Sequence, residues 1–135
     1  MTKQPPKSPG PLVFEAVVPI LFVSDVTAGA NFFADKLGFE IDFLYGTPPF
    51  YGSVSRDGVC LHLRFVHQPV FSKAAAQEES LVAASFEVSD VQSLLVEFET
   101  RGADIVQKLV RHDWGGTDFH VRDPDGNVVS FVTYG

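Results

Sequence analysis

An internal repeat constrains the fold of this chain more than any other feature of its sequence. The tetrapeptide Val-Ser-Asp-Val at 23–26 recurs letter for letter at 88–91. Two further matches follow in the same order, namely Leu37-Gly38-Phe39 with Arg101-Gly102-Ala103, and Asp57-Gly58 with Asp125-Gly126. Each match lies where a helix or hairpin is expected to begin or end. Two unrelated halves would need three coincidences, so the repeat indicates duplication of one structural unit.

Each copy predicts a strand, a helix and three further strands. In the first copy (13–66), apolar and β-branched runs predict strands at 13–23, 39–45, 50–55 and 59–66. Ser24-Asp25 and Gly38 are typical of the two ends of the intervening helix. The second copy (81–134) repeats this pattern with strands at 81–88, 103–109, 117–121 and 128–134, and with a helix from Ser89-Asp90 to Gly102. We therefore expect an α+β fold of two tandem βαβββ modules in a single domain, 13–134.

The remaining segments are expected to be connections. Residues 1–12 contain four prolines before or at Pro11 and predict a disordered lead-in. Residues 67–80 are polar and alanine-rich, which predicts a linker with one helical turn at most. Neither segment resembles a signal peptide, and no run reaches the ~20 apolar residues that span a membrane.

Side-chain alternation assigns the two faces of each predicted sheet. Val59, Leu61 and Leu63 should pack on the helix of the first module, so Cys60, His62 and Arg64 should face the other way. The same alternation directs these further side chains away from the helices: Val18, Ile20, Phe22, Ala83, Ser85, Glu87, Val128, Ser130 and Val132. Two curved sheets would together make a cup lined by these residues.

The net charge and the cysteine content limit the kinds of ligand and metal site that we expect. The chain has 135 residues and a formal net charge of -7. A negative surface repels phosphate backbones, so nucleic-acid binding is not expected. Cys60 is the single cysteine, which excludes an internal disulfide and a cysteine-based zinc cluster and is typical of a reducing cytoplasm.

The paired units and their motifs resemble the vicinal oxygen chelate superfamily, which contains glyoxalases, extradiol dioxygenases and bleomycin-resistance proteins. The resemblance covers 13–134 and rests on Asp25-Val26 through Leu37-Gly38-Phe39, and on Trp114-Gly115 through Phe119 and the run 122–127 (RDPDGN). These details are most similar to the bleomycin-resistance branch. That branch implies a cup-shaped cavity for a small organic ligand.

The resemblance also implies four positions for metal ligands in the catalytic members. In this sequence they are Val18, His62, Ala83 and Ser130. Only His62 is a good metal ligand, whereas a catalytic site needs about three protein ligands. We therefore expect neither a metal site nor a cofactor, and no catalytic residue is assigned.

Several residues of the expected cup are candidates for ligand binding: Phe22, Cys60, His62, Arg64, Glu87, Trp114 and Ser130. The imidazole of His62 could bond a ligand or pair with a carboxylate such as Glu87. Cys60 is more typical of a small apolar residue than of a nucleophile. Trp114 lies beside Gly115-Gly116 in a predicted loop, where it could stack on a planar ligand or instead fill the core.

A second group of polar residues lies near Trp114. His112, Asp113, Asp118 and His120 are candidate metal ligands, but no rigid predicted element holds all four, so a metal site is not favoured.

Two functions remain open from the sequence. The first is a metal-free binding protein that sequesters a planar compound, with a cationic one favoured by the acidic charge. Bleomycin-like drugs are the ligands that the resemblance implies. The second is an enzyme of the lyase or dioxygenase kind, with non-standard metal ligands or metal-free chemistry at His62. In both cases the heavy use of aromatic residues in a short chain predicts a homodimer.

Overall fold

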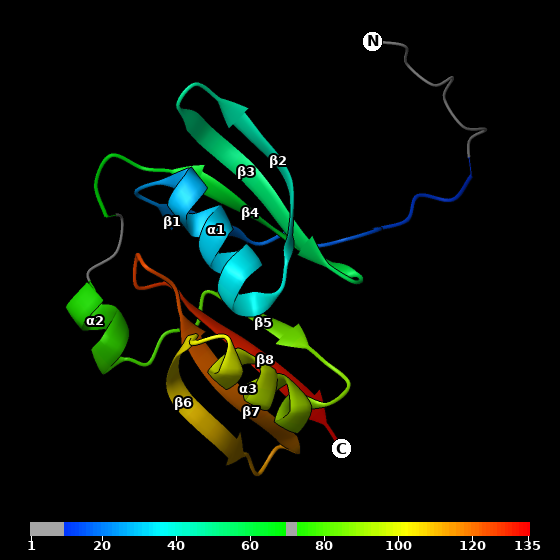
Figure 1. Cartoon of the computed structure of the whole chain (residues 1–135). Helices are drawn as coiled ribbons and strands as arrows, with labels where there is room; N and C mark the ends of the chain where they lie inside the picture. The colour runs from blue at the N-terminus through cyan, green and yellow to red at the C-terminus, as the bar shows by residue number, and fades with distance from the viewer. Residues whose placement is uncertain (1–9, 70–72) are drawn as a thin grey trace.

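A computed structural model describes residues 10–69 and 73–135. Most of the predicted lead-in (1–9) and the centre of the predicted linker (70–72) lie outside the described residues. Figure 1 shows the chain as two βαβββ modules that lie next to each other, with a short helix between them in sequence. The α+β fold with two such modules is therefore confirmed.

The first module contains one helix and four strands: β1 (Ile20–Val23), α1 (Val26–Leu37), β2 (Glu40–Gly46), β3 (Pro49–Arg56) and β4 (Val59–Phe65). The second repeats this order: β5 (Ala84–Glu87), α3 (Val91–Thr100), β6 (Asp104–Arg111), β7 (Gly116–Arg122) and β8 (Val128–Tyr134). Between them, α2 (Lys73–Glu78) is the helical turn expected in the linker.

Both sheets have the same topology. The strand orders are β1-β4-β3-β2 and β5-β8-β7-β6, with the first pair of each sheet parallel and the other pairs antiparallel. In each module the helix crosses one face of the sheet, and in the view of Figure 1 both helices lie in front of their sheets. The opposite face of each sheet carries no helix, and we call it the open face.

The helix ends follow the predicted signals. Asp25 accepts a hydrogen bond from the Ala28 amide at 3.0 Å, and Asp90 accepts one from the Ser93 amide at 3.1 Å. These bonds satisfy amides that the first helical turn leaves unpaired. Gly38 ends α1 with φ of 69°, a left-handed conformation that glycine adopts at little cost.

The first strand of each module is shorter than predicted. The sequence predicted strands at 13–23 and 81–88, whereas β1 and β5 have four residues each. Within the chain, β1 can pair only along β4, which begins at Val59, and β5 only along β8, which begins at Val128. The register places Val17 opposite Val59 and Ala83 opposite Val128, so the residues before 17 and before 83 run past the ends of β4 and β8. Between Val17 and β1, Pro19 has no amide hydrogen to donate to a ladder.

One hydrophobic core joins the two modules. It contains side chains of both helices and of both sheets, including Phe33, Phe39, Phe86, Phe98, Phe119 and Phe131. The rings of Phe39 and Phe86 connect the modules, with centroids 6.3 Å apart. Each fully buried phenylalanine contributes about 1.5–3 kcal/mol through the apolar area removed from water. Much of the aromatic content is thus used for packing the helix-covered faces.

Hydrogen bonds hold the turn between β7 and β8 of the second module against the first module. The Asn127 side-chain amide donates to the Phe22 carbonyl at 2.9 Å, and the Ser24 amide donates to Asp125 at 3.0 Å. The turn of the second module therefore holds the last residues of β1 in the first.

No helix in the described ranges is both long enough and apolar enough to cross a membrane.

Candidate functional site

The open face of the first sheet carries the residues that alternation predicted. The strand register places Ile20 opposite His62, and Phe22 opposite Arg64. On β4 the alternate residues Leu61 and Leu63 are fully buried against the helix. Phe22, Cys60, His62 and Arg64 consequently share one surface, which no helix covers.

His62 has a partner that the sequence did not reveal. Its Nδ1 atom and the Tyr51 hydroxyl form a hydrogen bond of 2.9 Å. The rings of Tyr51 and Phe43 contact the imidazole by their edges, with centroids 5.2 and 6.1 Å away. The predicted alternative of a pair with Glu87 is wrong, because the partner of His62 comes from the neighbouring strand of its own sheet.

Cys60 lies in a polar part of the same face. Its sulfur is 3.3 Å from the Ser53 hydroxyl, which also donates to Asp42 at 2.9 Å. Asp42 accepts a second bond from Ser55 at 2.7 Å. This network joins side chains of three neighbouring strands. The polar groups of Asp42, Ser53 and Cys60 therefore have hydrogen-bond partners within the sheet.

The open face of the second sheet is organised around Asp118 on β7, which is 7% exposed. Its carboxylate accepts hydrogen bonds from four side chains, with distances of 2.8 Å to His112 Nε2, 2.9 Å to Gln107, 3.3 Å to His120 Nε2 and 3.4 Å to Ser130. A carboxylate can only accept, so the Nε2 atom of each histidine must carry the hydrogen.

The charge of Asp118 is maintained by these donors. Burial is the largest single influence and raises its pKa, but the bonds from His112 and Gln107 and the proximity of His120 together outweigh it. The pKa of Asp118 therefore lies below its ordinary value, and its carboxylate is ionised at neutral pH.

Trp114 lies in the turn between β6 and β7 and is 61% exposed, so it does not fill the core. Its indole stacks on the His112 ring, with centroids 4.8 Å apart and an angle of 7° between the planes. Tyr134 lies on another side at 5.8 Å. A large aromatic surface is thus presented to solvent beside the open face of the second sheet.

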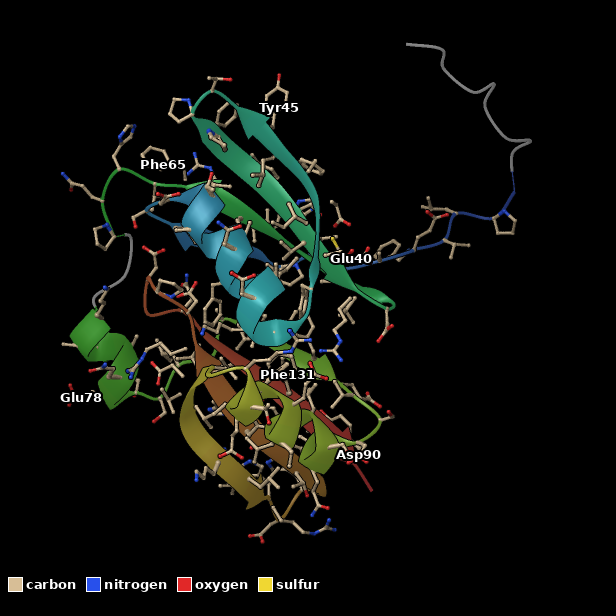
Figure 2. The ribbon with its side chains drawn as sticks, in the orientation of Figure 1. Glu40, Tyr45, Phe65, Glu78, Asp90 and Phe131 are labelled. Atoms are coloured by element: carbon tan, nitrogen blue, oxygen red, sulfur yellow. The ribbon has the colours of Figure 1, made fainter. Side chains whose placement is uncertain are left out.

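The predicted binding residues fall into two groups within the chain. Phe22, Cys60, His62 and Arg64 belong to the first sheet, whereas Ser130 and Glu87 lie on the open face of the second, with Trp114 at the adjacent turn. Figure 2 shows side chains on both modules. Two cavities of about 530 and 550 Å³ lie at the junction of the modules, and neither is lined by His62 or Trp114.

The residues at the implied metal positions do not fit a metal. Val18 and Ala83 offer no donor atom, and Ser130 already donates to Asp118. Within residues 10–69 and 73–135, no group of three or more histidine, cysteine or acidic residues is arranged to hold an ion. Of the four candidate ligands near Trp114, hydrogen bonds join His112, Asp118 and His120, whereas Asp113 lies in the turn after His112.

The sequence did not indicate that Tyr51 is the partner of His62, and it did not reveal Gln107 or the central role of Asp118. Tyr51 lies on β3 directly opposite Arg64 and therefore diagonally from His62. Gln107 reaches Asp118 across a pairing with irregular register. The two histidines near Asp118 in the sequence could have indicated a hydrogen-bonded cluster, but they were interpreted only as possible metal ligands.

The comparisons with known proteins agree with the fold and with the motifs of both modules. The model of the Glyoxalase/Bleomycin resistance protein/Dioxygenase superfamily matches residues 14–131. The chain therefore belongs to this superfamily. No curated protein matches the sequence.

Similar solved structures include two bleomycin-binding proteins and a third protein, TioX. A bleomycin-binding protein from bleomycin-producing Streptomyces verticillus, complexed with copper(II)-bleomycin, is 28% identical, with a TM-score of 0.71 over 92% of this chain and 98% of the other. Another bleomycin-binding protein, complexed with bleomycin, is 20% identical, with a TM-score of 0.72 and coverages of 90% and 100%. TioX from Micromonospora sp. ML1 is 22% identical, with a TM-score of 0.70 and coverages of 90% and 99%.

Proposed function

We propose that this protein binds a planar small molecule and sequesters it without chemical conversion. A cationic compound of the bleomycin type is the proposed ligand. The observation that carries the proposal is the exposed indole of Trp114, stacked on His112 next to an open sheet face. An aromatic ring in this position offers a planar ligand a large contact area and π electrons.

The chemistry of the open faces supports a ligand with both flat and polar parts. In the first module, Phe22 and Phe43 offer apolar surface, while His62 and Arg64 offer polar atoms. Phe43 is 46% exposed although it is a large hydrophobic residue. Exposed apolar side chains interspersed with a few polar groups are typical of ligand-binding surfaces.

Charge supports a cationic ligand. The ionised Asp118 lies on the open face of the second sheet together with the exposed Glu87. The whole chain has a net charge of -7. The negative net charge and the exposed carboxylate of Glu87 therefore attract cations, and the attraction should weaken as salt increases.

The contacts that the structure gives His62 and Cys60 suit binding rather than conversion. The Tyr51 hydroxyl is bonded to the Nδ1 atom of the imidazole, and Cys60, the single cysteine, is bonded to Ser53. Val18 and Ala83 provide no donor atoms at the positions where catalytic relatives hold a metal. His62 is thus proposed as a hydrogen-bonding group for the ligand.

A second copy of the chain is proposed to complete the binding cavity. Both helices cover the same side of the chain in Figure 1, so the two open faces of one chain do not enclose a ligand between them. All seven residues of β2 are exposed, including Ile41, Phe43 and Tyr45. The described residues Leu12, Phe14 and Val17 are each more than nine-tenths exposed. Covering these apolar side chains favours association with a second copy.

Titration with metal-free bleomycin tests the proposed function. Binding should change the emission of Trp114, the single tryptophan. In calorimetry, Trp114→Ala should weaken binding by about 1–3 kcal/mol, which is typical of an aromatic anchor. The melting temperature should change little, because the indole is largely exposed. If the variant is stable and its affinity is unchanged, Trp114 does not contact the ligand.

A further inference from the structure

The Trp114 indole is held by its stack on His112 and by the backbone of the turn in which it lies. The near-parallel stack on His112 covers part of the indole, and the turn beneath it is closed by two backbone bonds. The His112 amide donates to the Gly116 carbonyl at 2.8 Å, and the Gly115 amide donates to the His112 carbonyl at 3.0 Å. A turn closed in this way restricts the backbone on both sides of Trp114.

His112 is fixed in turn by a buried carboxylate. Its Nε2 atom donates to Asp118 at 2.8 Å, and Gln107 holds the same oxygen of Asp118 at 2.9 Å. Asp118 is 7% exposed on β7, which pairs with β6 and β8. The imidazole that stacks on the indole is thus held by a group that belongs to the sheet.

Gly116 leaves the space that the indole occupies. A Cβ atom at this position would overlap the six-membered ring of Trp114. Gly116 itself is buried, although the indole above it is mostly exposed. Any larger residue at 116 would displace the ring from its stack on His112.

We propose that His112 is a positioning residue, aimed by Asp118, that holds the Trp114 indole ready for a planar ligand. This inference rests on the proposed function, in which Trp114 contacts the ligand. A ring that is already held loses less conformational freedom on binding than a freely rotating one. The His112–Asp118 pair thus contributes to affinity without contacting the ligand, and the two histidines that flank Asp118 have different roles.

The test compares variants that touch different parts of this arrangement. His112→Ala removes the stack, and Asp118→Asn replaces the carboxylate without touching the indole. His120→Gln is the matched control, because His120 bonds the same carboxylate at 3.3 Å but is not stacked on Trp114. Gly116→Ala displaces the ring directly. Circular dichroism and melting curves of each variant establish that it is folded.

Time-resolved anisotropy and acrylamide quenching of Trp114 measure the mobility and accessibility of the indole. We expect both to increase in His112→Ala, Asp118→Asn and Gly116→Ala, and to stay at the parent level in His120→Gln. Affinity for metal-free bleomycin, measured by calorimetry, should fall by about 2- to 10-fold in the same three variants, the range for ordering one side chain.

The outcomes separate this inference from the proposed function. Unchanged anisotropy in folded His112→Ala and Asp118→Asn would overturn the positioning role, and so would increased mobility with unchanged affinity. If the parent protein does not bind bleomycin at all, the proposed ligand is wrong. An increase in Trp114 mobility would then still show that His112 positions the ring.

Discussion

Arg56 and Glu97 join the two modules by a two-pronged ion pair, in which Nη1 and Nη2 of the guanidinium donate to the two carboxylate oxygens at 2.8 and 2.9 Å. Arg56 Nη1 also donates to the Leu37 carbonyl at the end of α1, at 2.9 Å. Arg56 and, to a smaller extent, Arg101 donate hydrogen bonds to Glu97, and these bonds hold the pKa of Glu97 below its ordinary value. One side-chain cluster thus connects the end of α1, the end of β3 and the helix α3.

Replacing Glu97 should destabilise the protein. We expect Glu97→Gln to lower the free energy of unfolding by about 1–3 kcal/mol, because charge-assisted bonds of a half-buried arginine are lost. The measurement is urea denaturation at pH 7. Glu99→Gln is the control, since its contact with Lys108 is longer, at 3.6 Å, and more exposed. It should change stability by less than about 0.5 kcal/mol.

The effect of Glu97 should also depend on pH. Its folded pKa is lowered, so its stabilising contribution is present above the unfolded value of about 4.3 and is lost as the pH falls through the lower folded pKa. The difference between the parent and Glu97→Gln should therefore shrink between pH 5 and pH 3 (about the range of that titration). A constant difference across this range would contradict the account of the ion pair.

Asp123 should produce the opposite pH dependence. This residue is 4% exposed, and burial is the main cause that raises its pKa to about 6. A raised carboxyl pKa means that the folded state binds the proton more tightly than the unfolded chain, whose pKa is about 3.9. The resulting stabilisation is fully present below about 3.9 and is lost as the pH rises through about 6.

Comparison with Asp123→Asn isolates this titration. The free energy of unfolding of the parent, relative to the variant, should decrease by up to about 3 kcal/mol between pH 4 and pH 7.5. The variant will lose some stability at every pH, because the Asn127 side chain donates to Asp123 at 2.9 Å and meets an amide group instead. Denaturation curves in which this difference does not vary with pH would show that Asp123 ionises normally.

The exposed apolar residues before β1 should be required for the proposed dimer. We expect the parent to sediment as a dimer at micromolar concentration. Combined replacement of Leu12, Phe14 and Val17 by serine should increase the dimer dissociation constant by at least about tenfold, since each side chain loses apolar contact area. Glu15→Gln on the same segment is the control and should leave the dimer intact. If the parent is monomeric at this concentration, the proposal that a second copy completes the cavity is wrong.

Ligand binding should not depend on a bound metal. Treatment of the protein with a chelator followed by gel filtration should leave its affinity for metal-free bleomycin unchanged, because Val18, Ala83 and Ser130 occupy the implied ligand positions. Elemental analysis of the same samples checks the treatment. Loss of binding on chelation, restored by a divalent ion, would favour the enzyme class that the sequence left open.

The fold was largely predictable because its signals are local or repeated. Asp25 and Asp90 precede their helices with the same neighbours, and both side chains cap the helix as expected. Alternation along β4 also separated Leu61 and Leu63 from His62 correctly. These patterns depend on helix and strand geometry, which short stretches of sequence determine.

The candidate site was less predictable, because its contacts depend on the register between strands. Tyr51 reaches His62 diagonally across two strands, and Gln107 reaches Asp118 beyond an irregularity in the pairing of β6 and β7. The residues before β1 show the reverse error. Their β-branched, apolar sequence is typical of a strand, but a strand also needs a partner, and the register places every residue before Val17 beyond the first residue of β4.

The most direct test of the proposed function is a calorimetric titration of the parent protein with metal-free bleomycin, followed by mass spectrometry of the ligand released on denaturation. We expect saturable binding that weakens with increasing salt, an affinity reduced in Trp114→Ala, and recovery of the ligand with its mass unchanged. Absence of binding at low salt, or recovery of a chemically altered ligand, would contradict the proposed function.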